Sequence, residues 1–465
     1  MPADAEAHTD MAVTLAERAA TTLPQAQPKP LMQKFVIDGG APLSGTVVPA
    51  GNKNGALPIL AASVLTTDEV VVRNVPRIRD VEAMLDILRG LGVRVTWHGE
   101  HEVALQADGV ASDAEIDPAK AEAIRASFLL AGPLLARFGE ARMPPPGGDV
   151  IGRRRLDPHL DAFRALGAEI TFGTDVVLRA ARGLRAGDVF MDEPSVMATE
   201  NALLAAVRIP GSTVIGNAAC EPHVQDLARM LVKMGATIHG IGSNVLTVHG
   251  TTDLHGCTHD IAPDHIEIGS FMALAGVTGG ELRIRDCVSD DLRMICLVFE
   301  RLGLRSLMDG DDLLVPGDQR LVVKRDEGEF TAKVQDGPWP AFPADLTSIA
   351  IALATQSEGQ VLIHEWMFEN RMIFTDKLVN MGANIILCDP HRAIVYGRSQ
   401  LRGGRLESPD IRAGMAMLIA ALCAEGTSEI GNIRQIDRGY ERIDERLREL
   451  GARIERVATE PVSIS

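Results

Sequence analysis

The chain of 465 residues is 46% apolar and 23% charged, and it carries a formal net charge of −17 at neutral pH. This composition is typical of globular proteins, and the length predicts about two to three domains. An acidic chain lacks the broad basic surface that nucleic acids require, although a local cluster of arginines and lysines can still bind small anions. We therefore exclude nucleic acid as the main partner.

The first thirty residues lack the basic start and apolar core of a signal peptide and are predicted to form a disordered tail. The longest apolar run, residues 413–424, is too short to cross a bilayer. The six cysteines include no CxxC pair and no zinc-ligand spacing. They are predicted to be buried reduced thiols of a cytoplasmic protein with no metal site.

A unit of about seventy residues recurs six times, and such a period indicates a repeated architecture. Each copy contains a helix-like segment that ends in Leu-Gly or Met-Gly and precedes a short β-branched run, as in RALGAEITF and VNMGANIIL. Successive glycines are 75, 68, 68, 79 and 69 residues apart; they are Gly92, Gly167, Gly235, Gly303, Gly382 and Gly451. A glycine there is typical of a helix C-terminal cap with positive φ. The pattern predicts six α/β units in two globular domains of three.

Two glycine-rich stretches contain candidate anion-binding residues. In PAGNKNGALPIL, residues 49–60, Lys53 and Asn54 stand before an apolar helix whose N-terminus favours negative charge. The alternative is an ordinary turn. In PPPGGDVIGRRRLDPH, residues 144–159, Asp149 precedes three arginines that cannot all face one point in a helix or a strand. That stretch is either a solvated surface loop or a mobile lid over an anionic substrate.

Carboxylates and arginines also stand at later loop-to-helix junctions. The prolines of GPWPAFPAD place Asp345 at the start of a helix, where it is either functional or an N-cap. Arginines occupy equivalent junctions in FENR, PDIRAG and IDRGYERI; they are Arg371, Arg412 and Arg438. Each alone is consistent with a surface ion pair of little energetic value. No Ser-His-Asp elbow, HExxH or dinucleotide GxGxxG is present. The remaining candidate groups are carboxylates together with arginine and lysine in glycine- and proline-rich loops. This set suits group transfer involving a phosphorylated, carboxylated small molecule.

From about Phe35 to Val457 the sequence resembles the UDP-N-acetylglucosamine 1-carboxyvinyltransferases, a family of enolpyruvyl transferases. The motifs that carry the resemblance, in order, are GNKNGALPIL, RASFLLAGPLLARFG, PGGDVIGRRRLDPH, PDHIEIGSF, WPAFPADLTS, MFENR, SPDIRAG and IDRGYERI. The resemblance implies an α/β fold of two inside-out barrels, each with three βαβαββ units. It implies one domain at 53–262, with a catalytic lid at 144–155. The other would combine 31–52 with 263–458, and 459–465 would be a C-terminal tail.

The family reaction joins phosphoenolpyruvate to the 3′-hydroxyl of UDP-N-acetylglucosamine by addition and elimination, releases phosphate, and begins peptidoglycan synthesis. It uses no metal or organic cofactor. The resemblance implies that Asp345 takes the hydroxyl proton, that Lys53, Arg154 and Arg438 surround phosphoenolpyruvate, and that Arg412 lies near its carboxylate. The implied sugar-nucleotide pocket comprises Asn54, Arg125, Arg154, Arg155, Leu156, Asp157, Pro158, Glu193, Pro194, Ser195, Val196 and Met367, with Lys53 and Asp345 also touching substrate. Glu221, Asp264, Arg371 and Asp410 correspond to supporting cleft residues.

The sequence departs from the family pattern at Asp149, where most members carry a cysteine. That thiol donates a proton and is alkylated by fosfomycin, whereas a minority of members have aspartate. A carboxylic acid can also donate a proton when desolvation favours its neutral form. We therefore predict that Asp149 is the proton donor and that the protein is insensitive to fosfomycin. The alternative is an aspartate that merely pairs with Arg153 or Arg155.

Further departures concern the substrate rather than the reaction. His265 stands where an arginine is common, Glu193 where some members have lysine, and Leu129 where some have an aromatic residue. Two alternatives stay open. One is an enolpyruvyl transferase for another nucleotide or for shikimate 3-phosphate, and the other is a non-catalytic sugar-nucleotide binder.

Overall fold

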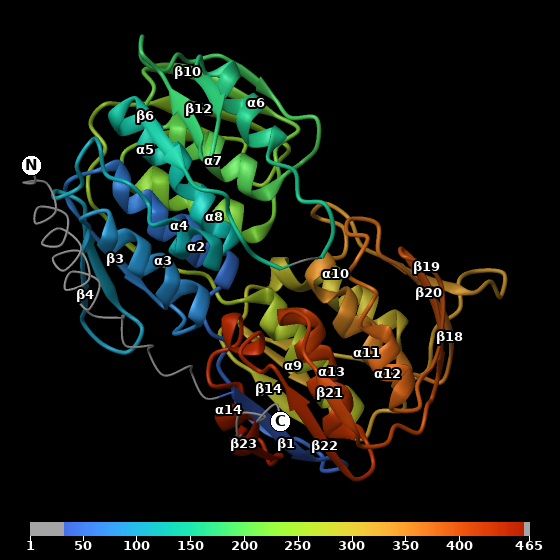
Figure 1. Ribbon diagram of the computed structural model, residues 1–465. Coiled ribbons are helices and arrows are strands. Elements are labelled where there is room, and N and C mark those ends of the chain that lie inside the picture. The colour runs from blue at the N-terminus through green and yellow to red at the C-terminus, as the bar shows by residue number, and fades with distance from the viewer. Residues whose placement is uncertain (1–31, 150, 460–465) are drawn as a thin grey trace, which may run out of the picture.

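The computed structural model describes residues 32–149 and 151–459, so the expected N-terminal tail and almost all of the expected C-terminal tail lie outside the described residues. Buried apolar side chains form two separate clusters, which define two lobes. The first-lobe cluster extends from Ala56 to Ile261, and the second-lobe cluster combines Phe35 to Val47 with Ile266 to Ile454. In Figure 1 the first lobe is blue to green, and the second is yellow to red with a blue strand among the red ones.

One set of helices forms the interior of each lobe, and the sheets together with a second set of helices form its outer surface (Figure 1). In the second lobe three helices pack against one another: α9 (His265–Thr278), α11 (Thr347–Gln356) and α13 (Ile411–Cys423). Nearly every residue of these helices is buried, because they are apolar on all sides rather than along one stripe. The apolar run at 413–424 belongs to one of them. Within the described residues, no helix is long and apolar enough to span a membrane.

Five of the six units share one topology: a strand, an inner helix, a parallel strand, an outer helix and two antiparallel strands. Within the described residues, the sheet of the second unit has three antiparallel strands and lacks the first, parallel one. In the third unit, β10 pairs in parallel with β9 and antiparallel with β12, where Thr213 lies opposite Val248. The first lobe comprises α2 (Lys53–Ala62), β3 (Glu69–Arg73), α3 (Arg79–Gly90), β4 (Arg94–Trp97), β5 (Val103–Gln106) and β13 (Thr258–Asp260); α4 (Pro118–Ala123), η2 (Arg125–Leu130), α5 (Ala131–Phe138), β6 (Glu140–Met143), α6 (Asp157–Ala165), β7 (Glu169–Phe172) and β8 (Val176–Arg179); and β9 (Asp188–Phe190), α7 (Val196–Ala206), β10 (Gly211–Gly216), α8 (Pro222–Lys233), β11 (Thr237–His239) and β12 (Val245–Gly250).

The second lobe repeats this topology with one substitution. Its last sheet takes β1 from the start of the chain and places it between β22 and β23, so that Ile37 lies opposite Ser428 and Ile454. The lobe comprises β2 (Gly45–Val47), α9 (His265–Thr278), β14 (Leu282–Ile284), α10 (Ser289–Arg301), β15 (Leu307–Asp309) and β16 (Asp312–Val315); β17 (Ala332–Gln335), η3 (Ala344–Leu346), α11 (Thr347–Gln356), β18 (Gly359–His364), α12 (Thr375–Asn380), β19 (Asn384–Asp389) and β20 (Arg392–Gly397); and β21 (Arg405–Glu407), α13 (Ile411–Cys423), β22 (Thr427–Gly431), η4 (Ile436–Arg438), α14 (Ile443–Glu449), β23 (Arg453–Thr459) and β1 (Met32–Asp38).

The chain passes between the lobes twice, and the two crossings are hydrogen-bonded to each other. The amide of Asn52 donates to the carbonyl of Ala262 at 2.8 Å, and the amide of Asp264 donates to the carbonyl of Ala50 at 2.9 Å. Gly51 lies between these bonds, and a Cβ atom there would meet the carbonyl oxygen of Asn74 at 1.8 Å. A residue with a side chain therefore cannot occupy this position without moving the backbone.

Two expectations from the repeat and the cysteines can be compared with the structure. All six repeat glycines have positive φ, between 92° and 108°, which confirms their predicted role as helix caps.

All six cysteines are free, as predicted, but Cys287 alone among them is buried and Cys388 is exposed, so the expected burial is wrong for most of them. Cys388 lies on β19, where side chains alternate between the two faces of a strand.

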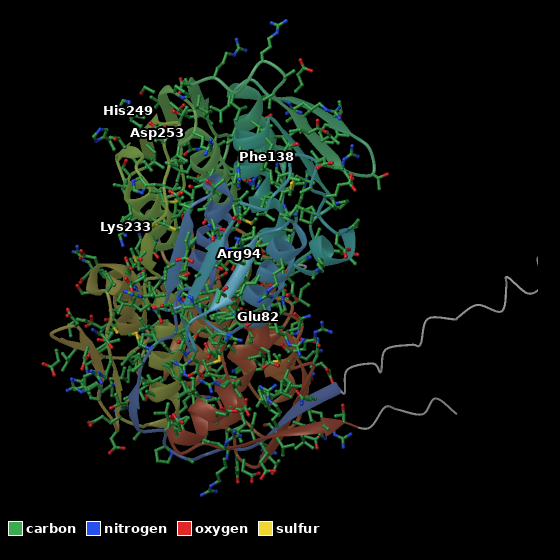
Figure 2. All side chains as sticks on the ribbon, turned by 90° about the vertical axis from the view of Figure 1, so that its left-hand side faces the viewer. Glu82, Arg94, Phe138, Lys233, His249 and Asp253 are labelled. Carbon is green, nitrogen blue, oxygen red and sulfur yellow. The ribbon has the colours of Figure 1, made fainter. Side chains whose placement is uncertain are left out.

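Charged side chains lie on the outer surface of the first lobe, as Arg94, Lys233 and Asp253 illustrate (Figure 2).

Candidate active site

The inner helices of all six units begin at one cavity of about 240 Å³ between the lobes. Residues at these helix starts line the cavity: Lys53 and Asn54 of α2, Arg125 of η2 before α5, Val196 and Met197 of α7, His265 and Ile266 of α9, Asp345 of η3 before α11, and Ile411 and Arg412 of α13. Each helix N-terminus carries partial positive charge and unpaired N–H groups. Their convergence makes the cavity attractive to anions before any side chain is counted.

Asp345 lies between two arginines at the floor of this cavity. Its Oδ1 accepts a hydrogen bond from Arg371 Nη2 at 3.1 Å, and its Oδ2 accepts from Arg412 Nη2 at 3.0 Å and Nε at 3.2 Å. Asn54 Nδ2 lies 3.5 Å from the same Oδ2. Burial alone would raise the pKa of Asp345, but Arg412, Arg371 and Lys53 outweigh it and hold the pKa well below its ordinary range. The carboxyl group is therefore ionised, and it binds arginines rather than capping a helix.

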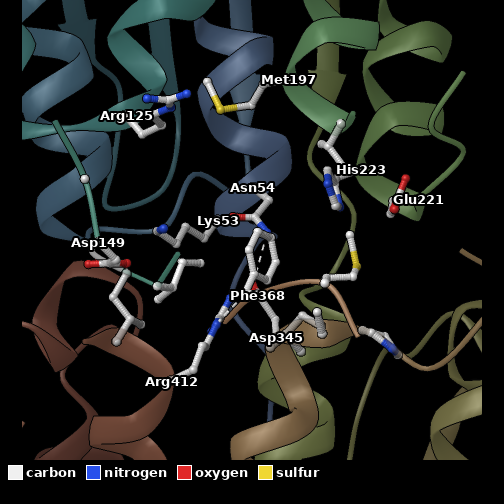
Figure 3. A pocket seen from close by; sticks show the side chains of 18 of the residues that line it. Lys53, Asn54, Arg125, Asp149, Met197, Glu221, His223, Asp345, Phe368 and Arg412 are labelled. Carbon is white, nitrogen blue, oxygen red and sulfur yellow. Dashed lines mark hydrogen bonds and ion pairs between the residues drawn. The ribbon is translucent and has the colours of Figure 1, made fainter. Parts of the chain in front are cut away.

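Asp149 reaches the cavity from the loop that follows β6, and it contacts the opposite lobe. Its carboxylate accepts a hydrogen bond from Arg438, not from Arg153 or Arg155, so the alternative pairing is wrong. Figure 3 shows Asp149 and Lys53 on the same side of the cavity, with Asp345 and Arg412 below them. The two acids thus approach one cavity from different lobes.

A buried aspartate that the sequence analysis missed connects these cations. Asp80, in the first turn of α3, lies 3.1 Å from Lys53 Nζ and accepts from Arg438 Nε at 2.8 Å. Burial opposes its ionisation, but Lys53 and Arg438 hold the pKa of Asp80 below its usual value. Asp80 follows PRIR in an ordinary amphipathic helix, so no motif distinguishes it. Its role depends on a contact with Arg438 of the other lobe.

Arg125 and Arg154 are two half-buried cations without a carboxylate partner in direct contact among the described residues. Arg125 Nη2 donates to the carbonyl of Arg154 at 2.8 Å. Burial and the charge of Arg154 lower the pKa of Arg125 to about 10. Burial also lowers the pKa of Arg154, which Asp149 and Asp345 partly offset. Of the three consecutive arginines, Arg154 alone lines the cavity, in agreement with the geometric argument from the sequence.

Most of the remaining residues expected to bind the nucleotide lie outside the cavity. Arg155 Nη1 contacts Asp192 at 2.7 Å and Glu193 at 3.7 Å, which joins the two expected segments. Met367 and Val196 line the cavity itself. Six predicted residues beside Arg155 do not line it: Leu156, Asp157, Pro158, Glu193, Pro194 and Ser195. Their part in nucleotide binding stays a prediction.

The four supporting residues have separate structural roles. Asp264 caps α9 by accepting from Ile266 N at 2.8 Å, and Asp410 caps α13 by accepting from Arg412 N at 2.8 Å. Arg371 holds Asp345, as described above. Burial raises the pKa of Glu221, which backbone N–H groups lower only in part.

Two histidines form a neutral aromatic wall beside these groups. The rings of His223 and His265 stack with centroids 6.2 Å apart, and Trp339 meets His265 edge-on. Burial lowers the pKa of His223 to about 3 and that of His265 to about 4. Where an arginine is common, His265 therefore adds no charge to the cavity. His223 was not expected from the sequence, because an isolated histidine carries no motif.

Comparisons with known proteins agree with this geometry. The family described as EPSP synthase (3-phosphoshikimate 1-carboxyvinyltransferase) matches residues 37–447, which places the chain in the class of enolpyruvyl transferases. Among solved structures, the enolpyruvyl transferase NikO from Streptomyces tendae has a TM-score of 0.82 at 24% identity, covering 93% of this chain and 100% of its own. EPSP synthase from Acinetobacter baumannii has a TM-score of 0.70 at 20% identity, covering 92% and 100%. These structures confirm the predicted fold class.

Relatives with higher sequence identity indicate one family within this class of transferases. UDP-N-acetylglucosamine 1-carboxyvinyltransferase from Bradyrhizobium diazoefficiens is 55% identical over 91% of this chain and 98% of its own length. The enzyme of the same name from Treponema denticola is 50% identical over 91% and 99%. The chain belongs to the family of UDP-N-acetylglucosamine 1-carboxyvinyltransferases.

Proposed function

We propose that this chain transfers the enolpyruvyl group of phosphoenolpyruvate to the 3′-hydroxyl of UDP-N-acetylglucosamine and releases phosphate, as the first committed step of peptidoglycan synthesis. The observation that supports it most is the convergence of Lys53, Asp149, Asp345, Arg412 and Arg438 on one cavity of a chain 55% identical to a protein of that name. A cytoplasmic location is part of this proposal.

The reaction proceeds in two balanced steps. In the addition, the sugar oxygen bonds to C2 of phosphoenolpyruvate, the hydroxyl proton leaves to a base, and C3 gains a proton from an acid. In the elimination, the C2–O bond to phosphate breaks and a proton leaves C3, which restores the double bond. General acid–base catalysis therefore needs a base near the sugar hydroxyl and an acid near C3 of phosphoenolpyruvate.

Asp345 is the proposed base for the hydroxyl proton, and Asn54 orients that hydroxyl. In the structure Arg371 and Arg412 stabilise the carboxylate and so weaken it as a base. The carboxylate and phosphate of phosphoenolpyruvate compete for the same cations when they bind. Their negative charge raises the basicity of Asp345 at the moment when both substrates are present.

Asp149 is the proposed acid for C3. It contacts Arg438 in the structure. When the phosphate of phosphoenolpyruvate binds Lys53 and Arg438, Asp149 loses its cationic partner and faces a dianion, both of which favour its protonated form. Arg154 and Arg125, which lack a direct carboxylate partner among the described residues, provide further positive charge for the substrates.

Residues at the edge of the cavity are proposed to bind the nucleotide. Arg155 connects the segment 154–158 to the segment 193–196, and Val196 and Met367 line the cavity between that edge and Asp345. The lid role of 144–155 belongs to this proposal as well, although Val150 lies outside the described residues.

The test is to incubate the protein with phosphoenolpyruvate and each candidate acceptor, to measure phosphate, and to weigh the product. We expect release with UDP-N-acetylglucosamine, and none from an Asp345→Asn variant. Asp389→Asn, on exposed β19, is the matched control and should turn over normally. Faster release with shikimate 3-phosphate, or stoichiometric binding without release, would instead support one of the two alternative functions.

A further inference from the structure

Arg371 contacts a second carboxyl group besides Asp345. Its Nη2 lies 3.1 Å from Asp345 Oδ1, and its Nε lies 3.5 Å from Glu365 Oε2. The side chain of Glu365 is 0% exposed and that of Arg371 is 3% exposed. The guanidinium group is therefore enclosed between two acids, one in the cavity and one in the interior.

Glu365 also fixes the segment that carries Arg371. Its Oε1 accepts from the amide of Phe368 at 3.0 Å, and its backbone amide donates to the carbonyl of His391 at 2.8 Å. Met367, Phe368 and Arg371 all line the cavity. A movement of the Glu365 carboxyl group would thus be transmitted to three cavity residues.

A second buried acid, Asp336, faces Glu365. Asp336 is 2% exposed, and its carboxylate accepts from the amide of Trp366. Burial raises the pKa of Glu365 to about 8; Arg371 opposes this shift, and the charge and hydrogen bond of Asp336 add to it. Asp336 Oδ2 and Glu365 Oε2 are both buried and form no hydrogen bond to other groups of the described residues, so one proton shared between the two carboxyl groups would satisfy both oxygens. The pair then carries a single negative charge.

That single charge balances the site. Asp345 bears one negative charge and is held by two buried arginines, Arg371 and Arg412, so these three groups alone carry one surplus positive charge. Asp410 near Arg371 and Asp264 near Arg412 offset only part of it, because each also caps a helix. An uncompensated buried charge is strongly unfavourable. The charge of the acid pair, adjacent to Arg371, removes the surplus.

We propose that Asp336 and Glu365 act together as positioning residues, a one-proton acid pair that serves as counter-ion to Arg371 and keeps it on Asp345. The inference rests on the proposed function of Asp345. Because either acid alone can carry the one charge, each can be replaced at small cost, whereas loss of both leaves Arg371 uncompensated.

The pair also gives activity a pH dependence. The groups that face Glu365 are Asp336 after β17, Arg371 on the loop after β18, the Thr347 hydroxyl of α11, and His391 between β19 and β20. As pH rises through about 8, Glu365 loses the shared proton and the pair gains a second negative charge. The pair then competes with Asp345 for Arg371, so we expect kcat to fall above this pH.

The experiment compares kcat, and KM for UDP-N-acetylglucosamine, in wild type, Glu365→Gln, Asp336→Asn and the double variant. At pH 7 each single variant should lie within a few-fold of wild type, while the double variant should lose about 100-fold in kcat with KM little changed. Both single variants should lack the fall above pH 8. Glu358→Gln, an exposed glutamate just before β18, is the control and should keep the wild-type profile.

Three results would overturn the inference: a single variant as impaired as the double, a double variant with wild-type kcat, or the same fall above pH 8 in both single variants. The last comparison holds even where the double variant does not fold. If the wild type turns over no substrate, the proposed function fails instead. Thermal melting then still tests the pair. Because the folded pKa of Glu365 is raised, its stabilising contribution is present below the unfolded value and is lost as pH rises to about 8. If the Tm of Glu365→Gln falls with rising pH as steeply as that of the wild type, the acid pair is contradicted.

Discussion

Asp149 belongs to the first lobe by sequence and to the second by its contact with Arg438. A residue of this kind is placed by its partner, because Arg438 of the opposite lobe fixes where the carboxyl group lies. In general a thiol is mostly protonated at neutral pH, whereas a free carboxylic acid is mostly ionised there. In its proposed role as proton donor, Asp149 therefore depends on Arg438 and on the substrate that binds beside it.

At this scale we predict that Asp149→Asn loses turnover by at least about 100-fold, because an amide cannot supply the proton. Steady-state phosphate release measures it, with product mass as the identity check. Near-normal turnover would rule out Asp149 as the donor.

The reciprocal substitution tests the predicted insensitivity to fosfomycin. Wild type should keep its activity after incubation with fosfomycin, since no thiol is present at residue 149. Asp149→Cys should become inactivated with time and gain the mass of the drug. Inactivation of the wild type at the same rate would contradict the prediction.

The site residues that the sequence predicted, such as Lys53, Asp345 and Arg412, lie in glycine- or proline-rich junctions whose composition is unusual. Asp80 and Glu365 could not be predicted, because each follows an ordinary element and its importance depends on a contact distant in sequence: Arg438 for Asp80, and Asp336 for Glu365. A pattern along the chain reveals local chemistry, whereas these two residues are defined by which elements meet.

Among the elements, the loop that carries Asp149 depends on close backbone contacts. A Cβ atom on Gly147 would meet the carbonyl oxygen of Glu122 at 1.7 Å, and one on Gly148 would meet Arg125 Cβ at 2.8 Å. The amide of Gly147 donates to Ala121. The glycines therefore allow the loop to lie against the end of α4, which fixes where Asp149 begins.

Gly147→Ala should displace this loop and lower kcat by about 10- to 100-fold, because catalytic groups must be placed within fractions of an ångström. The core contacts of the first lobe are remote from it, so Tm should change little. Gly404→Ala, where a Cβ would meet nothing within 4 Å, is the matched control for kinetics and melting. Wild-type kcat in Gly147→Ala would show that the close contact is not needed.

The six units themselves were predictable, since the glycine after each outer helix marks a local requirement for positive φ. The pairing of strands from distant parts of the chain was not predictable. β1 completes the last sheet and β13 the first, and both pairings join distant parts of the chain with strand sequences that resemble many others. Such pairing is decided by packing rather than by local sequence.

For the whole molecule, several contacts between the lobes involve charged groups, and one set lies at the cavity. Asp80, which pairs with Lys53 inside the first lobe, also accepts a hydrogen bond from Arg438 of the second, while the amide of Arg77 donates to Glu441 at 2.8 Å. Charge at the cavity is therefore part of what holds the two lobes together.

We predict that acid weakens this attachment. The folded pKa of Asp80 is lowered, so its contribution to stability is present above the unfolded value of about 3.8 and is lost as pH falls through the folded value. Asp80→Asn should cost about 3 kcal/mol at pH 7, because it removes the carboxylate that pairs with Lys53 and one of the two carboxylates that hold Arg438, and should flatten the loss of Tm in acid. Melting from pH 7 to pH 3 measures both effects.

Asp86→Asn, at an exposed position on the same helix, is the control and should melt as wild type does. If Asp80→Asn melts in parallel with wild type across this range, Asp80 does not link the lobes.

The paired crossings near Gly51 have a mechanical consequence. Two segments joined by hydrogen bonds, unlike a single flexible linker, behave as the two leaves of a hinge. They allow rotation about one axis and resist twisting or sliding. Any rotation of the lobes about this axis would bring Asp149 and Arg438 back to the same meeting point. Accuracy at the reacting carbon is in this way set by a ribbon of a few residues in which no side chain fits at the centre.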